Sequence, residues 1–308
     1  MKTKQNRPIL VIGKSRSYRA SFQEAANLIV SNLKTLCVSL FPFPLAIGIV
    51  GAVLLQLAGA GIVSLAVGIV VFSFAVSMFC TAFCQMMKDF GKTQVLEKIS
   101  WKKDFKAIAL KSLTPFYLLL LQTAFWAALA IGTTVCIGLR PGWAVAISGA
   151  AVLIVVALCV PFNISLGCAW FSGLGFVKSA LRGFTAMRHH YGPTLMLLFM
   201  SVIVIAVACI IGCTPLLILD RAVDASETAI SFGDPTDMPS LIYVVRFILR
   251  LVLFSLMAFM LLLWLVPLYL HHFSMQKKDE ERKKEQEKLQ MTREAYKTAR
   301  ENYYLTTP

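Results

Sequence analysis

The sequence has little charge, and almost none of that charge lies inside its long apolar runs. Charged residues make up 15% of the chain and hydrophobic residues 57%. No Asp, Glu, Lys, Arg or His lies in the middle of any of the six runs described below. Ionisable groups at such depth usually mark proton relays or ion paths. Their absence argues against a proton-coupled pump of the usual kind.

The sequence also lacks the motifs of common catalytic and nucleotide-binding sites. We find no Walker phosphate loop, dinucleotide-binding fingerprint, GxSxG elbow, HExxH or EF-hand loop. All eight cysteines lie in apolar runs rather than in loops, where a disulfide or zinc cluster would be expected. We expect them to be packing residues, with a thiolate metal site in the bilayer as the alternative. No catalytic residue, metal or cofactor is predicted, and an enzyme is the less favoured class.

Six apolar runs are long enough to cross the hydrocarbon core, which takes about 20 residues. In lipid the backbone must satisfy its own hydrogen bonds, and the alternating pattern of a membrane barrel is absent. We therefore predict an all-α polytopic membrane protein with six transmembrane helices: Leu36–Leu57, Gly61–Met86, Pro115–Leu139, Trp143–Phe171, Thr194–Leu219 and Leu251–Leu270. Residues 1–35 would form a basic arm and amphipathic helix, 36–273 the transmembrane domain and 274–308 a charged tail.

The basic residues gather on one side of this topology. Of the 30 Lys and Arg residues, 26 lie in the N-terminal arm, the second and fourth connections and the tail, with 11 of the 16 acidic residues. The other connections and their flanks carry four basic and five acidic residues. Because cytoplasmic loops are enriched in Lys and Arg, we expect a multi-pass inner (plasma) membrane protein with both termini cytoplasmic. Attraction to anionic lipid explains the basic side more simply than nucleic-acid binding, so no nucleic-acid partner is expected.

The chain repeats one organisation three times: a basic amphipathic stretch, a span, a short outer connection and a second span. The entries to these units are 79 and 80 residues apart, at Thr35, Thr114 and Thr194. A proline lies near each entry: Pro42, Pro115 and Pro193. This pattern predicts three hairpins, although any six-span protein with short outer loops has the same appearance. Arg140-Pro141-Gly142 is expected to form one tight turn, and the acidic segment Asp220–Ser240 the one long outer loop.

The segment Ala20–Lys34 predicts an amphipathic helix that lies in the membrane interface. Six of its apolar residues are expected to face lipid: Phe22, Ala25, Ala26, Leu28, Ile29 and Leu33. Prolines in the first turns of the following span would fix its entry angle. Four glycines would allow the first two spans to pack closely: Gly48, Gly51, Gly59 and Gly61.

The stretch Asn27–Leu33, leading to Phe41-Pro42-Phe43-Pro44, resembles bacterial six-span membrane families. These are the YesL-like proteins and the membrane domain attached to some glycerophosphodiester phosphodiesterases. The resemblance covers residues 20–273 and implies a six-span helical fold with no catalytic residues in the membrane. The soluble phosphodiesterase domain has no counterpart here, so no hydrolase activity is implied. The acidic outer segment and the charged tail depart from the YesL-like pattern.

Two groups of residues are candidates for a function. Gln122 and Asn163 lie inside spans and are expected to make interhelical hydrogen bonds, with the lining of a substrate path as the alternative. Pro161 is expected to kink the helix beside Asn163. Nine charged or imidazole side chains are candidate contacts for lipid headgroups or anions: Lys102, Lys103, Lys106, Arg182, Arg188, His189, His190, Arg246 and Arg250.

Two histidine pairs and one arginine pair each allow more than one interpretation. His189-His190 and His271-His272 lie at the inner interface and could meet if spans five and six are neighbours. Neighbouring residues of a helix point about 100° apart, so neither pair chelates a metal readily. Arg246 and Arg250 share a helix face, and we expect them to snorkel to headgroups or to pair with Asp220 or Asp224.

The sequence favours a non-enzymatic membrane module that contacts anionic lipids, or a membrane or cytoplasmic partner, through its basic face and tail. A permease-like or transporter-associated subunit is one alternative, because of the repeat and Asn163. A lipid-modifying enzyme that uses the histidine pairs at the inner interface is another.

Overall fold

The protein is built from long α-helices. The computed structural model describes residues 16–57, 62–93, 101–232 and 239–306, and this part contains no strand. Its elements are α1 (Tyr18–Leu40), α2 (Pro42–Leu57), α3 (Ile62–Thr93), α4 (Trp101–Leu139), the 3-10 turn η1 (Pro141–Trp143), α5 (Ala144–Ser172), α6 (Phe176–Ser231), α7 (Ser240–Met260) and α8 (Leu262–Thr306). Five segments are long and apolar enough to cross a membrane, and a sixth results if α1 and α2 count as one bent span. The predicted all-α polytopic fold is confirmed.

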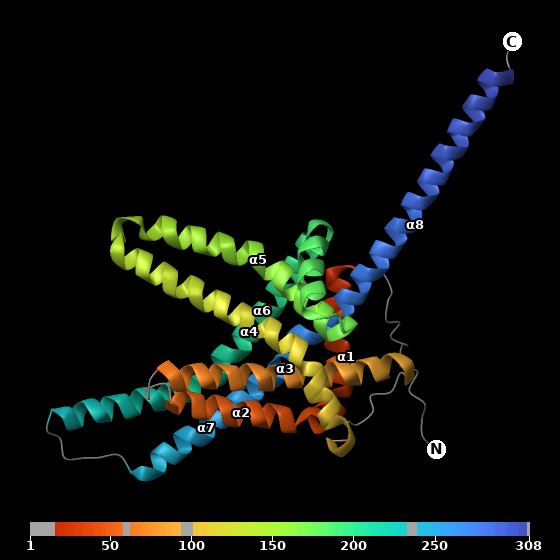
Figure 1. Ribbon diagram of the computed structural model, residues 1–308. Helices are drawn as coiled ribbons and strands as arrows, with labels where there is room; N and C mark the ends of the chain where they lie inside the picture. Colours follow the sequence, from red (N-terminus) through yellow and green to blue (C-terminus); the bar gives the residue numbers. More distant parts are fainter. Residues whose placement is uncertain (1–15, 58–61, 94–100, 233–238, 307–308) are drawn as a thin grey trace, which may run out of the picture.

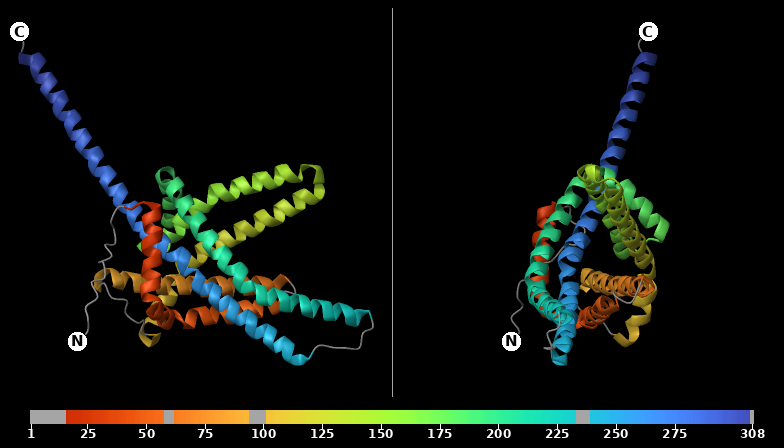
Figure 2. Two further views of the ribbon diagram at one scale, coloured as in Figure 1. Left: turned by 180° about the vertical axis from the view of Figure 1, so that it is seen from behind. Right: turned by 90° about the vertical axis from the view of Figure 1, so that its left-hand side faces the viewer.

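The helices form antiparallel pairs whose turning ends point to one side. The C-terminal ends of α2, α4 and α6 lie on that side (Figure 1), and we call it the tip side. The opposite side, where α1 crosses the bundle and the end of α8 projects, we call the base side (Figures 1 and 2). α2 packs on α3 and α7, and α5 packs on α4 and α6. The expected turn at Arg140 is present, because Trp143 donates a backbone hydrogen bond to the Arg140 carbonyl over 3.0 Å.

On the base side, each helix pair begins with a segment that runs in a different direction from the rest of the pair. α1 meets α2 at an angle of 67°, with Phe41 at the break. Pro115 lies inside α4 and Pro193 inside α6, and α6 changes direction within its N-terminal half (Figure 2). A proline removes one helical hydrogen bond and crowds the preceding turn, so it favours such bends.

Several predicted boundaries are wrong. Leu36–Leu40 belongs to α1, which leaves α2 with 16 residues and a length of about 24 Å. The segment that begins at Asp220 is helical as far as Ser231, since its alanine- and glutamate-containing sequence has no helix breaker. Leu241–Arg250 is part of α7, and the charged tail continues the last apolar helix without a break through α8.

The face of α1 that was expected to contact lipid packs inside the protein. Ala25, Leu28 and Ile29 are buried, whereas Val30 and Leu33 are exposed. The contacts of α1 with α8 and α3 explain this burial. The amphipathic pattern was correct, but the apolar surface that covers it is protein.

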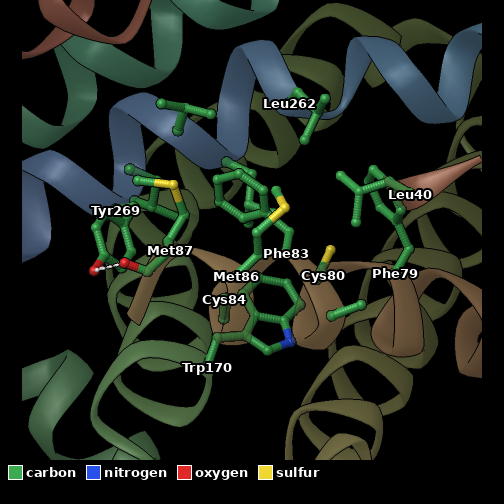
Figure 3. Packing of buried hydrophobic residues seen from close by; sticks show 14 of the residues in the cluster. Leu40, Phe79, Cys80, Phe83, Cys84, Met86, Met87, Trp170, Leu262 and Tyr269 are labelled. Atoms are coloured by element: carbon green, nitrogen blue, oxygen red, sulfur yellow. Dashed lines mark hydrogen bonds between the residues drawn. The ribbon is translucent and has the colours of Figure 1, made fainter. Parts of the chain in front are cut away.

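The main hydrophobic core lies where α3 passes between α1, α5 and α8. Phe79 and Phe83 of α3 are fully buried there, with Leu40, Trp170 and Leu262 in the same cluster (Figure 3). All eight cysteines are free. Cys80 and Cys84 are buried in this core, as expected for packing residues.

Two glycines bring α2 close to a helix that is distant in sequence. A Cβ atom on Gly48 would lie 2.6 Å from the Leu251 carbonyl oxygen of α7, and one on Gly51 would lie 2.7 Å from the Phe254 ring. These glycines therefore serve the contact of α2 with α7 rather than the expected contact with α3. Gly59 and Gly61 lie outside the described residues.

Candidate functional site

A layer of buried and half-buried polar side chains connects α8 with α5 and α6 on the base side, where the apolar sequence of α8 gives way to charge. We call this layer the α8 collar. It consists of four side chains of α8 and three from the helices beside it: His271, His272, Gln276, Asp279, Ser172 of α5, and His190 and Thr194 of α6. The collar is the largest group of polar contacts between helices in the part of the chain that the structure describes.

His271 connects α8 with α6. Its Nε2 atom lies 3.0 Å from Oγ1 of Thr194. His271 is 1% exposed and Thr194 is fully buried. The Nδ1 atom of His271 has no hydrogen-bond partner among the described residues. This contact lies just inside the proline-containing bend of α6, and so it fixes α8 at the point where α6 changes direction.

His272 connects α8 with the end of α5. Its Nε2 atom lies 2.9 Å from Oγ of Ser172 and 3.0 Å from Nε2 of Gln276, which also donates to Ser172 over 3.0 Å. An imidazole nitrogen that accepts from an amide N–H carries no proton, so the proton belongs on Nδ1. A side chain at Gly167 would approach that Nδ1 atom, because a Cβ there would lie 3.5 Å away.

Of the first histidine pair, His190 joins the collar through Asp279 rather than through His271 or His272. His190 is 4% exposed and its Nε2 atom lies 2.8 Å from Oδ1 of Asp279 on α8. His190 is therefore occupied by α8 rather than by a lipid headgroup. His189 is exposed and lines a shallow pocket of about 380 Å³ with four α8 residues: Arg282, Glu285, Gln286 and Leu289. Across the described ranges, no three His, Cys, Asp or Glu side chains are arranged to hold a metal ion.

The segment before α1 completes the attachment of α8. The backbone N–H of Arg16 donates to Oγ of Ser274 over 2.7 Å, and Ser274 donates back to the Arg16 carbonyl over 3.1 Å. Lys278 donates to the same carbonyl over 2.9 Å, while the Arg16 side chain pairs with Glu24 at 2.6 Å. Before it leaves the bundle, α8 is thus hydrogen-bonded to α5, to α6 and to the segment before α1.

Basic side chains in the N-terminal parts of α4 and α6 are exposed. Lys106 of α4 and Arg182 and Arg188 of α6 are accessible to solvent. Lys102 and Lys103 lie in α4, but their side chains are outside the described part. Large apolar side chains are exposed beside these cations: Phe105 of α4, and Val177, Leu181 and Phe184 of α6. Exposed cations next to exposed apolar residues are typical of helices that lie in a membrane interface.

Gln122 and Asn163 both make interhelical hydrogen bonds. Gln122 of α4 donates to the Phe162 carbonyl of α5 over 3.0 Å. Asn163 accepts from the indole N–H of Trp264 on α8 over 3.1 Å and donates to the Cys159 carbonyl over 2.7 Å. Neither residue lines the pocket at His189 or a second pocket between α2 and α7. The contacts are those of residues that fix helix packing.

Arg246 and Arg250 make the predicted pair with Asp220. Both guanidinium groups donate to Oδ1 of this carboxylate, Arg250 over 3.1 Å. The ion pairs connect α7 with α6 on the tip side.

The collar was only partly foreseeable. The histidine pairs were visible in the sequence, but Ser172, Gln276 and Asp279 have no distinguishing pattern around them. Comparison with family models, curated proteins and solved structures gives no match. The resemblance to YesL-like proteins therefore stays a prediction from the sequence.

Proposed function

We propose that this chain is a non-enzymatic module of the inner (plasma) membrane, with both termini cytoplasmic. Its base side holds anionic lipid, and α8 extends from the membrane as a charged rod for a partner complex. The observation that carries the proposal is that Lys106 of α4 and Arg182 and Arg188 of α6 are exposed on helix segments that also expose large apolar side chains. Such a surface can insert apolar groups at the acyl boundary while its cations attract anionic headgroups.

The N-terminal part of α6 supports lipid binding most directly. Val177, Leu181 and Phe184 follow the spacing of one helix face, and the first two are 63% and 62% exposed. Lys178 and Arg182 lie between them in sequence and are also exposed. Apolar side chains of this size gain free energy when lipid covers them, and each nearby Lys or Arg adds about 1 kcal/mol at an anionic surface.

The form of α8 supports a partner-binding role. Every side chain from Glu280 to Thr298 is exposed, over about 28 Å of helix. The end of α8 projects away from the other helices (Figure 1). The collar fixes the direction of this rod, because His271, His272 and Asp279 bind it to α5 and α6. A partner bound to the rod would therefore be held at a defined position relative to the membrane.

Matched charge variants test the lipid part of the proposal. One variant replaces Lys106, Arg182 and Arg188 with Gln, and the control replaces Lys283, Lys284 and Lys288 of the rod. The full-length proteins are placed in nanodiscs of phosphatidylcholine and phosphatidylglycerol, and the retained phosphatidylglycerol is measured by native mass spectrometry. We expect the base variant to lower the affinity by roughly 100-fold and the rod variant to leave it unchanged. Equal retention by both variants would reject lipid binding at the base.

The partner role has a separate test. A photocrosslinking residue at Tyr296, which is exposed on the rod, should give one discrete adduct in cells, and the rod variant should lose it. The base variant should keep the adduct. Absence of any adduct from several exposed rod positions would reject the partner role and leave lipid binding untouched.

A further inference from the structure

The charged residues on the tip side form a site with more positive than negative charge. Arg246 and Arg250 lie one turn apart on α7, and both donate to the single carboxylate oxygen Oδ1 of Asp220 on α6. The side chains of Arg246, Arg250 and Asp220 are 20%, 13% and 27% exposed. Two partly buried guanidinium groups therefore share one carboxylate, which leaves one positive charge without a counter-ion in the described contacts.

Arg250 retains a donor that no described residue accepts. Its Nε atom is buried and has no hydrogen-bond partner in the part of the chain that the structure describes. Arginine presents five N–H donors in a fixed planar arrangement that matches the oxygens of phosphate and carboxylate. Buried donors of charged groups are normally satisfied. The residues that the structure describes therefore supply no acceptor for this donor.

A pocket of about 260 Å³ is lined in part by both arginines. Its lining combines polar and apolar side chains from α2 and α7: Leu55, Gln56, Tyr243, Arg246, Phe247 and Arg250. A water molecule occupies about 30 Å³ of liquid, so the pocket has room for a small oxyanion with part of its organic substituent. Gln56 lies at the tip-side end of α2, which places the pocket near the level where α2 ends.

We propose that this pocket binds a singly charged phosphate ester. Arg250 and Arg246 donate to its oxygens, while Leu55 and Phe247 contact the organic part. Because Asp220 already offsets one of the two cations, the remaining charge matches a monoanionic phosphodiester better than a dianion. The phosphodiester can belong to a lipid headgroup at the tip-side surface or to a soluble phosphate ester.

Ligand binding in detergent tests the site on the full-length protein in which Lys106, Arg182 and Arg188 are replaced by Gln, so that base-side lipid does not add to the signal. The probes are short-chain phosphatidylglycerol, diacylglycerol without a phosphate, and dimethyl phosphate, each measured by native mass spectrometry. We expect phosphatidylglycerol to bind and diacylglycerol not to bind. Arg250→Gln and Arg246→Gln should each weaken binding by about 10-fold or more. Arg221→Gln is the matched control, because Arg221 is exposed and does not line the pocket.

Asp220→Asn distinguishes a binding site from an ion pair that is only structural. This substitution frees both arginines and keeps them in place, so we expect it to increase the affinity for phosphatidylglycerol. A decrease in a variant that keeps its thermal stability would overturn the proposal, as would equal binding by Arg250→Gln and the parent protein. Displacement of phosphatidylglycerol by an equal concentration of dimethyl phosphate would assign the site to a soluble ester; its absence would assign it to lipid. Because the base-side cations are replaced in all these proteins, failure here would concern the pocket alone and would not affect the proposed function.

Discussion

His271 and Thr194 form a buried hydrogen bond between α8 and α6, across 77 residues of sequence. The Nε2 and Oγ1 atoms are 3.0 Å apart, and both residues are inaccessible to solvent. A polar pair in such a place favours one arrangement of α8, because every other packing leaves two buried polar groups without partners. The projecting direction of the rod therefore depends on this layer.

Thr194→Val should destabilise the protein by about 1–3 kcal/mol, because it leaves His271 buried with no partner at Nε2. Thr214→Val on the same helix is the control, since Thr214 is exposed and bonds only to a carbonyl of its own helix. Thermal unfolding in detergent measures the difference. Adding His271→Phe to Thr194→Val should recover part of the loss. Equal stability of the two threonine variants would show that the collar does not fix α8.

Gly48→Ala should destabilise the contact of α2 with α7. The added methyl group would crowd the Leu251 carbonyl, and overpacking costs about 1–3 kcal/mol. Gly149→Ala in α5 is the control, because nothing lies within 4 Å of its Cβ position. That substitution should stabilise its helix by up to about 1 kcal/mol. A higher midpoint of unfolding for Gly48→Ala than for Gly149→Ala would show that α2 and α7 are not closely packed.

Phe83→Ala should be among the most costly core substitutions, at about 3–5 kcal/mol. Phe83 of α3 is fully buried in the core that α3 forms with α5 and α8, whereas Phe105 is 53% exposed. Phe105→Ala removes the same atoms and should have a much smaller effect. Chemical unfolding monitored by tryptophan fluorescence compares the two, and similar losses of stability would contradict the assigned core.

A double-mutant cycle at Asn163 and Trp264 should show coupling of about 0.6 kcal/mol, the average for interhelical hydrogen bonds in membranes. The cycle uses Asn163→Leu, Trp264→Phe and the combination, with free energies of unfolding in detergent. Additive effects would mean that the 3.1 Å contact contributes nothing.

The helical class and the pairing of helices could be predicted because hydrocarbon permits few solutions. Apolar length alone located the long helices, and Pro141 and Gly142 located one turn. The spacing of Arg246 and Arg250 placed both on one face, and Asp220 was among the predicted partners. These inferences use only local sequence, and local sequence determines helix length and helix face.

The features that could not be predicted depend on which helix surfaces contact one another. The apolar face of α1 looks the same whether lipid or protein covers it, so the burial of Leu28 and Ile29 had no local signal. The collar joins residues 77 to 104 positions apart, from Thr194 with His271 to Ser172 with Gln276. The acidic segment that begins at Asp220 was predicted to be a loop, although acidic residues do not end a helix.

The central claim is that the tip and base sides face different compartments, with the base side cytoplasmic. A membrane-impermeant maleimide tests it on single cysteines introduced at Thr228, exposed near the tip-side end of α6, and at Thr298 on the rod. The background carries Cys136→Ser, because Cys136 is exposed, and the same background without an added cysteine is the control. Intact cells should label Thr228→Cys alone, and inverted membrane vesicles should label Thr298→Cys alone. Labelling of both positions from the same side would contradict the account.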